Sequence, residues 1–220
     1  MLSSDSPAFA HNMTPAAMLG RADAVLVDLD GTLVDSTAPV RRVWDAFASR
    51  HGLDGEAVTR FAQGRPSRET IRLLAPDADH DEEATVVEQA EIHDTCGVAA
   101  LPGAAALLAS DHQLAIVTSC STALAEARLR AAGLTIPGLL VSSDGLQRGK
   151  PDPECFLIAA RRLGVRPAQC VVIEDAPAGV QAGRAAGATV IALRTTHSDD
   201  ELSEAHAITD DLASLLTVAP

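Results

Sequence analysis

The stretch VLVDLDGTLVDS, residues 25–36, decides the fold class of this chain. Its apolar, β-branched start predicts a buried strand, and two carboxylates, Asp28 and Asp30, follow where this strand ends. Carboxylates two positions apart on an extended chain point the same way, and like charges so close together cost free energy. The stretch therefore indicates a site that needs both carboxylates.

Four further apolar runs fit strands that are buried on both faces. They are LAIVTS (114–119), LLVSSD (139–144), VVIED (171–175) and TVIALR (189–194). Alanine-rich amphipathic segments lie between them, and several of these end in Gly, a common helix stop. The alternation predicts an α/β fold with a doubly wound, Rossmann-like parallel sheet and right-handed crossovers. A short strand near residues 205–209 and a final helix would close the chain.

The alternation breaks once, between the first and second predicted strands. Residues 37–101 show four helical patterns and no convincing strand. We therefore expect a helical cap domain, residues 37–101, inserted after the first strand, with hinges at 35–38 and 99–103. Residues 77–94 carry eight acidic residues and no Lys or Arg, which is typical of a solvated helix face.

The remaining residues divide into a tail and a core. Residues 21–36 and 102–220 would form the α/β core, and we interpret residues 1–20 as a disordered tail. This N-terminal segment lacks the basic start and continuous apolar stretch of a secretory signal. The four cysteines show no C-x-x-C spacing, so we expect reduced thiols and a cytoplasmic location.

Composition excludes several classes of partner. The formal net charge of −13 argues against nucleic acid, because a phosphate backbone demands a basic surface. No apolar run approaches the roughly 18 residues of a membrane span. We therefore expect no nucleic acid and no membrane as a partner, and a monomer or dimer. An anionic substrate would need a strong local source of positive charge.

Polar residues end three of the predicted strands, where ligands collect in doubly wound folds. The strand ends supply Asp28, Asp30, Thr118, Ser119, Glu174 and Asp175. Each ending alone also fits a helix N-cap. All three at one rim favour a site, and clustered carboxylates need a cation. Hard oxygen ligands suit Mg²⁺, so the cluster predicts a Mg²⁺ site from Asp28, the neighbourhood of Asp30, and Asp175.

Lysine usage adds to this prediction. The chain has 17 basic residues, and the single lysine among them is Lys150, in QRGKPDPE directly after the third predicted strand. One interpretation is that a single lysine remains by chance in an arginine-rich composition. The position favours the other, that this site needs a compact ammonium rather than a planar guanidinium.

With these residues in place, the chain resembles the haloacid dehalogenase superfamily, in its phosphatase branch with a helical cap after the first strand. The four signature stretches occur in order: DLDGTLVDS (28–36), VTS (117–119), RGKPDPE (148–154) and VIEDAPAGVQA (172–182). The resemblance implies a Mg²⁺-dependent phosphatase that hydrolyses a small sugar or polyol phosphate through an aspartyl-phosphate.

The resemblance also implies roles for individual residues. Asp28 corresponds to the nucleophile, and Asp30 to the general acid that protonates the leaving alcohol and then acts as the base for water. Asp28, the carbonyl of Asp30 and Asp175 would ligate Mg²⁺. Glu174 would act through water or by orienting the other ligands. Gly31 fits the sharp turn after the strand.

The phosphate-binding residues follow from the second and third signature stretches. Thr118, with the backbone of Ser119, and Lys150 would bind the phosphoryl oxygens and stabilise charge in the transition state.

The resemblance leaves alternatives open. An acid at Asp30 argues against a dehalogenase, and a cap without lysine argues against a phosphonate-cleaving enzyme. A mutase of the β-phosphoglucomutase type is closer, because Ser67 and Arg68 resemble its substrate-gripping loop. That branch carries a histidine where this chain has Val40, so we expect hydrolysis.

The cap sequence is most similar to sugar-phosphate, glycerol-phosphate and 2-deoxyglucose-6-phosphate phosphatases, and phosphoglycolate stays open as a substrate. Gln63, Arg65 and Arg68 are candidates for reading the substrate hydroxyls, with a solvated helix position as the alternative for each. We interpret Trp44 and Phe47 as cap core.

Overall fold

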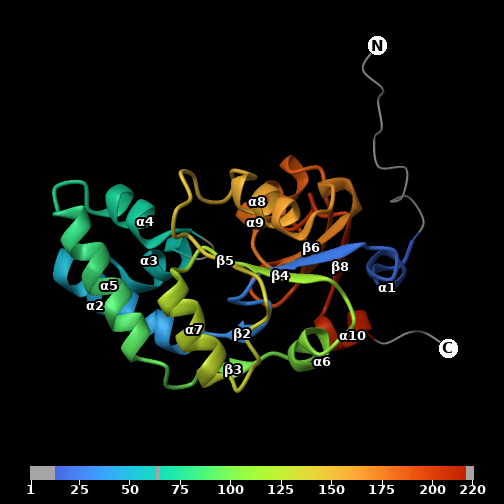
Figure 1. Ribbon diagram of the computed structural model, residues 1–220. Helices are drawn as coiled ribbons and strands as arrows, with labels where there is room; N and C mark the ends of the chain where they lie inside the picture. The colour runs from blue at the N-terminus through green and yellow to red at the C-terminus, as the bar shows by residue number, and fades with distance from the viewer. Residues whose placement is uncertain (1–12, 63–64, 217–220) are drawn as a thin grey trace, which may run out of the picture.

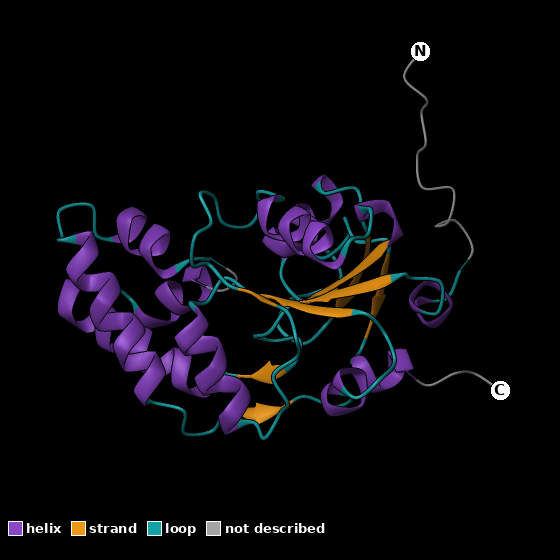
Figure 2. Cartoon of the chain, viewed as in Figure 1, coloured by secondary structure: helices purple, strands orange, loops and turns teal. Residues whose placement is uncertain are grey.

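A computed structural model describes residues 13–62 and 65–216 of the chain (Figures 1 and 2). The predicted apolar runs form one six-stranded sheet, in which each neighbouring pair is parallel. Its strands are β1 (Ala24–Val27), β4 (Leu114–Val117), β5 (Leu140–Val141), β6 (Cys170–Glu174), β7 (Thr189–Leu193) and β8 (Ala207–Thr209). The spatial order is β5-β4-β1-β6-β7-β8.

Helices cover both faces of this sheet, as Figure 1 shows. One face carries α1 (Pro15–Leu19), α6 (Ala104–Leu108), α7 (Thr122–Ala131) and α10 (Leu212–Leu216). The other carries α8 (Glu154–Leu163) and α9 (Pro177–Ala185), and the short helix η1 (Pro167–Gln169) leads into β6. Alternate strand residues serve the two layers: Val25 and Val27 pack on the first, Ala24 and Leu26 on the second. The predicted doubly wound α/β fold is thereby confirmed.

The first four helices after β1 in the described part of the chain form a separate layer beside the carboxyl end of the sheet (Figure 2). They are α2 (Thr37–His51), α3 (Gly55–Ala62), α4 (Ser67–Leu74) and α5 (His80–His93). Their apolar residues make a hydrophobic core of their own, in which Trp44, Phe47 and Ile71 are buried. We refer to these four helices as the cap. Its last helix, α5, packs against α7 of the core.

The chain enters and leaves the cap through two short strands. β2 (Val34–Asp35) pairs antiparallel with β3 (Ala99–Ala100), so that Val34 lies opposite Ala100. The expectation of no strand between residues 37 and 101 is therefore wrong at Ala99–Ala100. Two alanines carry no β-branched signal, and their pairing is set by the partner segment rather than by their own propensity.

Two further expectations differ from the structure. Part of the expected disordered tail is the helix Pro15–Leu19, because Met18 and Leu19 bury their side chains in the core; residues 1–12 lie outside the described residues. The expected strand at 139–144 is only two residues long, since Ser142 and Ser143 already turn toward other partners.

Within the described ranges, no helix has the length and apolarity to cross a membrane.

The strand order creates a switch point beside β1. Chain connections run from β1 to β4 on one side and return to β6 on the other side. The carboxyl ends of these three strands therefore border one crevice, which is where ligands bind in open α/β sheets.

Candidate active site

The turn after β1 separates the two aspartates of the opening stretch. Leu29, between them, is fully buried, and Asp28 and Asp30 reach different surroundings. Gly31 makes the turn with φ +81°, a conformation that L side chains rarely adopt. A Cβ there would lie 2.2 Å from Oδ2 of Asp175, so glycine also lets β1 approach the end of β6.

Asp28 is buried and pairs with the lysine that the sequence singled out. Lys150 Nζ donates to Asp28 Oδ1 at 2.5 Å, to Glu174 Oε1 at 2.7 Å, and to the carbonyl of Val117 at 3.1 Å. Three strand ends thus share one buried ammonium, which is 3% exposed. Although burial opposes its charge, Asp28 and Glu174 raise the pKa of Lys150 well above its ordinary value. Lys150 is therefore a permanent cation here.

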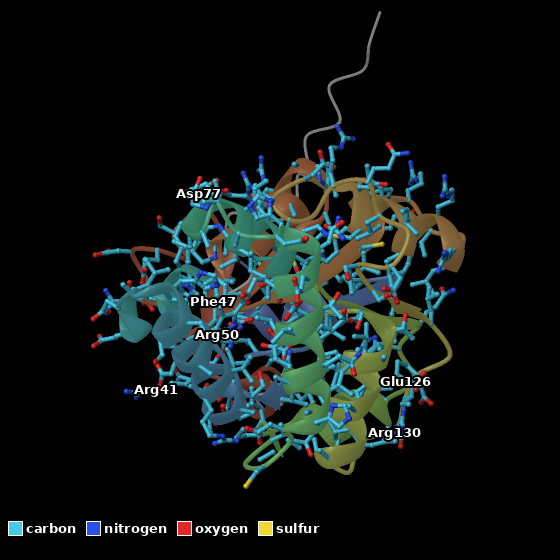
Figure 3. The ribbon with its side chains drawn as sticks, turned by 90° about the vertical axis from the view of Figure 1, so that its left-hand side faces the viewer. Arg41, Phe47, Arg50, Asp77, Glu126 and Arg130 are labelled. Carbon is cyan, nitrogen blue, oxygen red and sulfur yellow. The ribbon has the colours of Figure 1, made fainter. Side chains whose placement is uncertain are left out.

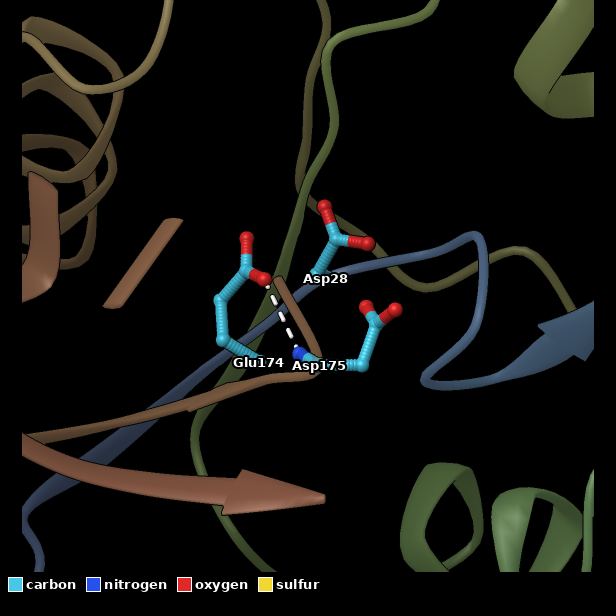
Figure 4. Close-up of side chains that lie close together, drawn as sticks. All are labelled: Asp28, Glu174 and Asp175. Carbon is cyan, nitrogen blue, oxygen red and sulfur yellow. Dashed lines mark hydrogen bonds between the residues drawn. The ribbon is translucent and has the colours of Figure 1, made fainter. Parts of the chain in front are cut away.

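Two carboxylates pair with this ammonium, and a third, Asp175, lies close to both of them. Asp28, Glu174 and Asp175 each offer an oxygen within 4.8 Å of the others, and Figure 4 shows their side chains converging from β1 and the end of β6. Asp175 is held separately, because Thr32 Oγ1 donates to its Oδ1 at 3.1 Å and Thr196 Oγ1 donates to its Oδ2.

Crowding and burial perturb two of these acids. Burial raises the pKa of Asp28 well above its usual range, the charges of Glu174 and Asp175 add to this, and Lys150 opposes it. Burial, followed by the charge of Glu174, raises the pKa of Asp175 to about 7. Without further positive charge, the cluster is therefore electrostatically unfavourable at neutral pH.

Glu174 is the best-anchored acid of the cluster. Its Oε1 accepts from Lys150, and its Oε2 accepts from the backbone N–H groups of Asp175 (2.9 Å) and Ala176 (3.0 Å). The first turn of α9 leaves room for this carboxylate only because residue 179 is glycine, where a Cβ would lie 1.8 Å from Oε1. The geometry suits a residue that orients its neighbours.

Asp30 has its own set of partners. Its Oδ1 accepts from Ser36 Oγ at 2.6 Å, and its Oδ2 accepts from Arg128 Nη1 at 2.7 Å and lies 3.1 Å from Cys120 Sγ. The two neighbouring aspartates thus have separate counter-charges, Lys150 for Asp28 and Arg128 for Asp30. This arrangement reduces the like-charge cost that the sequence spacing implies.

Arg128 connects the core to the cap. It is only 4% exposed, and its Nη2 lies 3.5 Å from Oε1 of Glu91 on α5. Burial raises the pKa of Glu91 to about 7, with Asp30 and Glu88 adding and Arg128 opposing. The acidic stretch 77–94 was expected to form a solvated helix face, and this is wrong for Glu91, which is 5% exposed.

Sequence reasoning missed both Arg128 and Glu91, although each left a signal. On α7, the buried positions are Leu124, Ala125, Arg128 and Leu129, so the arginine occupies the apolar face at helical spacing. On α5, Glu91 follows the buried Val87 by one turn. A charged residue at an apolar position of a helix pattern indicates a buried partner.

Two of the predicted phosphate-binding residues, Thr118 and Ser119, directly follow β4, the strand that pairs with β1. Thr118 is buried, and its Oγ1 accepts from the backbone N–H of Cys120 at 3.1 Å. Thr118, Ser119 and Lys150 all line one cavity of about 1220 Å³ with the acidic cluster.

This cavity lies between the cap and the core. Cap residues in its wall include Val40, Trp44, Arg65 and Arg68. Arg65 donates to the carbonyl of Phe61 at 2.8 Å, while Arg68 pairs with Asp81 at 2.9 Å and is largely exposed. Both arginines can therefore be reached from the cavity, and each already has a partner. Gln63, the third candidate for substrate recognition, lies outside the described residues.

The residues present fit a divalent cation. Three buried carboxylates within 4.8 Å provide the hard oxygen donors that Mg²⁺ prefers. Burial is the main cause of the raised pKa of Asp28 and of Asp175, neighbouring negative charge adds to it, and a cation would relieve that part. The side chain of Asp30 lies outside this cluster, bound to Arg128.

Comparison with known proteins gives consistent matches. The family model of haloacid dehalogenase-like hydrolases matches residues 22–187, which include the cap and β1 to β6. Hexitol phosphatase A of Escherichia coli (strain K12) is 42% identical over 202 residues, covering 89% of this chain and 94% of that protein. Validoxylamine A 7'-phosphate phosphatase of Streptomyces hygroscopicus subsp. limoneus is 36% identical over 200 residues, covering 86% and 94%.

Solved structures agree in fold. CbbY from Rhodobacter sphaeroides, in complex with phosphate, superposes with a TM-score of 0.76 at 25% identity, over 88% of this chain and 96% of that one. A hydrolase from Pseudomonas syringae superposes with the same TM-score at 28% identity, over 88% and 95%.

Proposed function

Because the chain belongs to the haloacid dehalogenase-like hydrolase family, we propose that it is a Mg²⁺-dependent phosphatase of small sugar or polyol phosphate monoesters. The observation that carries this proposal is the Asp28 carboxylate, fixed by Lys150 at 2.5 Å among buried acids and open to a cavity under the cap. Lys150 together with a bound Mg²⁺ would supply the local positive charge that an anionic substrate needs in this acidic protein.

The proposed reaction has two steps on Asp28. In the first, a carboxylate oxygen of Asp28 attacks phosphorus, the bond from phosphorus to the alcohol oxygen breaks, and Asp30 gives that oxygen a proton. In the second, Asp30 takes a proton from water, whose oxygen attacks phosphorus. The bond from Asp28 to phosphorus breaks, and inorganic phosphate leaves.

The other residues bind and orient. Lys150, Thr118 and the backbone of Ser119 hold the phosphoryl oxygens, since all three line the cavity beside Asp28. Asp28, Asp175 and the carbonyl of Asp30 are the proposed metal ligands, and Glu174 orients Lys150 through the 2.7 Å contact. A bound Mg²⁺ would neutralise developing charge on the phosphoryl oxygens.

The substrate class rests on the cavity and the relatives. About 1220 Å³ leaves room for an organic group beside the phosphate, and Arg65 and Arg68 on the cap are the proposed contacts to its hydroxyls. The relatives are named as phosphatases of a hexitol and of validoxylamine A 7'-phosphate. Hydrolysis is preferred to a mutase reaction because Val40, which lines the cavity, offers no proton.

Four free cysteines support the proposed cytoplasmic location.

The test measures phosphate release from a panel of monoesters: hexitol phosphates, glycerol phosphate, 2-deoxyglucose 6-phosphate, phosphoglycolate and a hexose 1-phosphate. We expect turnover in Mg²⁺, loss of turnover in excess EDTA, and the highest kcat/KM on a sugar or polyol phosphate. Conversion of the hexose 1-phosphate to the 6-phosphate, in place of free phosphate, would establish the mutase instead.

The variant Asp28→Asn tests the nucleophile. It keeps the size of the side chain and removes the attacking oxyanion, so we expect phosphate release to fall by at least about 10³-fold. Arg130→Met, on the exposed surface of α7, is the control and should retain wild-type turnover. Turnover of Asp28→Asn near the wild-type rate would refute the assignment.

A further inference from the structure

Arg128 is a buried cation for which the proposed reaction has no role. It is 4% exposed on α7, and its side chain lines the cavity under the cap. A buried guanidinium is costly unless each of its faces is paired. Nη1 donates to Asp30 Oδ2 at 2.7 Å and to Cys120 Sγ at 2.9 Å, and Nη2 faces Glu91 at 3.5 Å. The planar, rigid guanidinium thus fixes the direction from which it holds Asp30.

The carboxylate of Asp30 is clamped at both oxygens. Arg128 holds Oδ2 from the core, and Ser36 Oγ donates to Oδ1 at 2.6 Å from the start of the cap. Ser36 is 5% exposed and precedes α2 directly, without capping it through its side chain. Its hydroxyl therefore serves Asp30 rather than the helix. Both contacts restrict rotation of a group that must be aimed at a leaving oxygen.

The second partner of Arg128 belongs to the cap. Glu91 is on α5, which packs against α7, and the two helices lie side by side in Figures 1 and 3. The contact between Arg128 and Glu91 therefore crosses the boundary between cap and core. Movement of α5 away from α7 would expose Glu91 and would leave Nη2 without this acid.

We propose that Arg128 is a positioning residue that orients the Asp30 carboxylate, and that Glu91 makes this orientation depend on the cap lying against the core. The inference rests on the proposed function, since it assigns Asp30 the transfer of a proton to the leaving alcohol. If the cap were displaced, the Asp30 carboxylate would be free to rotate beside a bound phosphoryl group. Proton transfer then becomes efficient only when the cavity is closed to bulk water.

The experiment compares leaving groups. An alkyl phosphate such as glycerol phosphate expels a strongly basic alkoxide and needs the proton, whereas 2,4-dinitrophenyl phosphate expels a stable phenolate without one. Phosphoryl transfer to the enzyme is measured in single turnover for Arg128→Met, Arg128→Lys and Glu91→Gln. Arg130→Met is the matched control on the same helix, because Arg130 is 66% exposed and points outward beside Glu126 (Figure 3).

We expect Arg128→Met to slow transfer from glycerol phosphate by about 100-fold or more, the range of general acid catalysis, and from the dinitrophenyl ester by less than about 5-fold. Arg128→Lys should recover part of the alkyl rate, and Glu91→Gln should show a smaller loss with the same selectivity. Equal losses on both substrates, or no loss on either, would overturn the proposal.

Two further readouts keep the result decisive. If Arg128→Met does not fold, Glu91→Gln, which keeps the shape of the side chain, decides alone through its selectivity. Hydrogen exchange along α5 gives a measure that is independent of turnover, and it should accelerate in Glu91→Gln but not in Arg130→Met. Unchanged exchange would refute the link to the cap. A wild-type protein inactive on every ester would refute the proposed function itself, while lost selectivity in an active enzyme concerns Arg128 only.

Discussion

Replacing Lys150 with methionine tests the electrostatic core of the site. Methionine keeps most of the length of the side chain and removes the ammonium that lies 2.5 Å from Asp28 and 2.7 Å from Glu174. The variant leaves three buried carboxylates within 4.8 Å of one another, without the cation that now pairs with two of them. We expect Lys150→Met to unfold more easily in the absence of a divalent metal.

The expected size follows from two bounds. Removing one partner of a buried ion pair costs about 3–5 kcal/mol. A carboxyl group avoids this cost if it takes up a proton. For an ordinary pKa of 3.8, protonation costs about 1.4 kcal/mol for each pH unit by which the solution pH exceeds the pKa. That route costs about 5 kcal/mol at pH 7.5 and under about 2 kcal/mol at pH 5. Lys150→Met should therefore lose about 3–5 kcal/mol at pH 7.5 and about 1–2 kcal/mol at pH 5.

The sign of the pH dependence is set by the carboxylates. Loss of the ammonium would raise the pKa of Asp28 and of Asp175 further in the folded state, so the folded state would bind protons more tightly than the unfolded chain. Stability then falls as pH rises between the unfolded and folded pKa values. The free energy of unfolding is measured by urea titration with far-UV circular dichroism, in EDTA, at both pH values. Added Mg²⁺ should restore part of the loss, because it binds the folded cluster only.

The control for this experiment is Arg148→Met, which removes a positive charge two residues away. Its side chain is 71% exposed, so the expected change is within about 0.5 kcal/mol. If Lys150→Met loses less than about 1 kcal/mol at pH 7.5, or loses equally at both pH values, then Lys150 is not the counter-charge of the cluster and the electrostatic reasoning is wrong.

Three further predictions concern the same acids. Because the pKa of Asp28 is raised and that of Asp175 is raised to about 7, protons should compete with Mg²⁺. The affinity for Mg²⁺ by calorimetry should therefore fall at least about tenfold per pH unit below 7, and a pH-independent Kd would contradict this. Since the pKa of Glu91 is raised to about 7, the wild-type protein loses stability as pH rises toward that value. The stability difference between Glu91→Gln and wild type, measured by urea titration, should therefore shift by about 1–3 kcal/mol in favour of the variant from pH 5 to pH 8. A constant difference would refute that assignment. Gly179→Ala, whose Cβ would lie 1.8 Å from Glu174 Oε1, should lower stability by about 1–3 kcal/mol, while Gly138→Ala, which meets nothing within 4 Å, should be neutral in the same thermal unfolding assay.

Much of the core could be predicted from the sequence for one physical reason. Strands of a parallel sheet are buried on both faces, so they read as continuous apolar runs, and their carboxyl ends meet at one edge. That geometry brings Asp28 and Asp175 together, although they are far apart in the chain, whereas Lys150 reaches them from the loop between β5 and α8. The cap likewise follows from helical patterns between the first two strands.

The remaining features depend on contacts that no local pattern encodes. Glu91 and Arg128 belong to different layers, and each becomes meaningful only when α5 meets α7. The strand Ala99–Ala100 exists because Val34–Asp35 lies beside it. The helix Pro15–Leu19 depends on two side chains, Met18 and Leu19, finding the core. Tertiary packing decides all three.

The pairing of β2 with β3 has a consequence for how such a protein can diversify. Val34 lies opposite Ala100, so the two ends of the cap segment leave the core at neighbouring points. A segment whose ends already meet can be lengthened, shortened or exchanged with little change in closure entropy, and without altering the span that the core must bridge. The cap is therefore encoded by one contiguous stretch of the gene and can be exchanged as a unit. Recombination at residues 35 and 99 could give the same reaction machinery a new substrate range, and a library for directed evolution could be confined to that stretch.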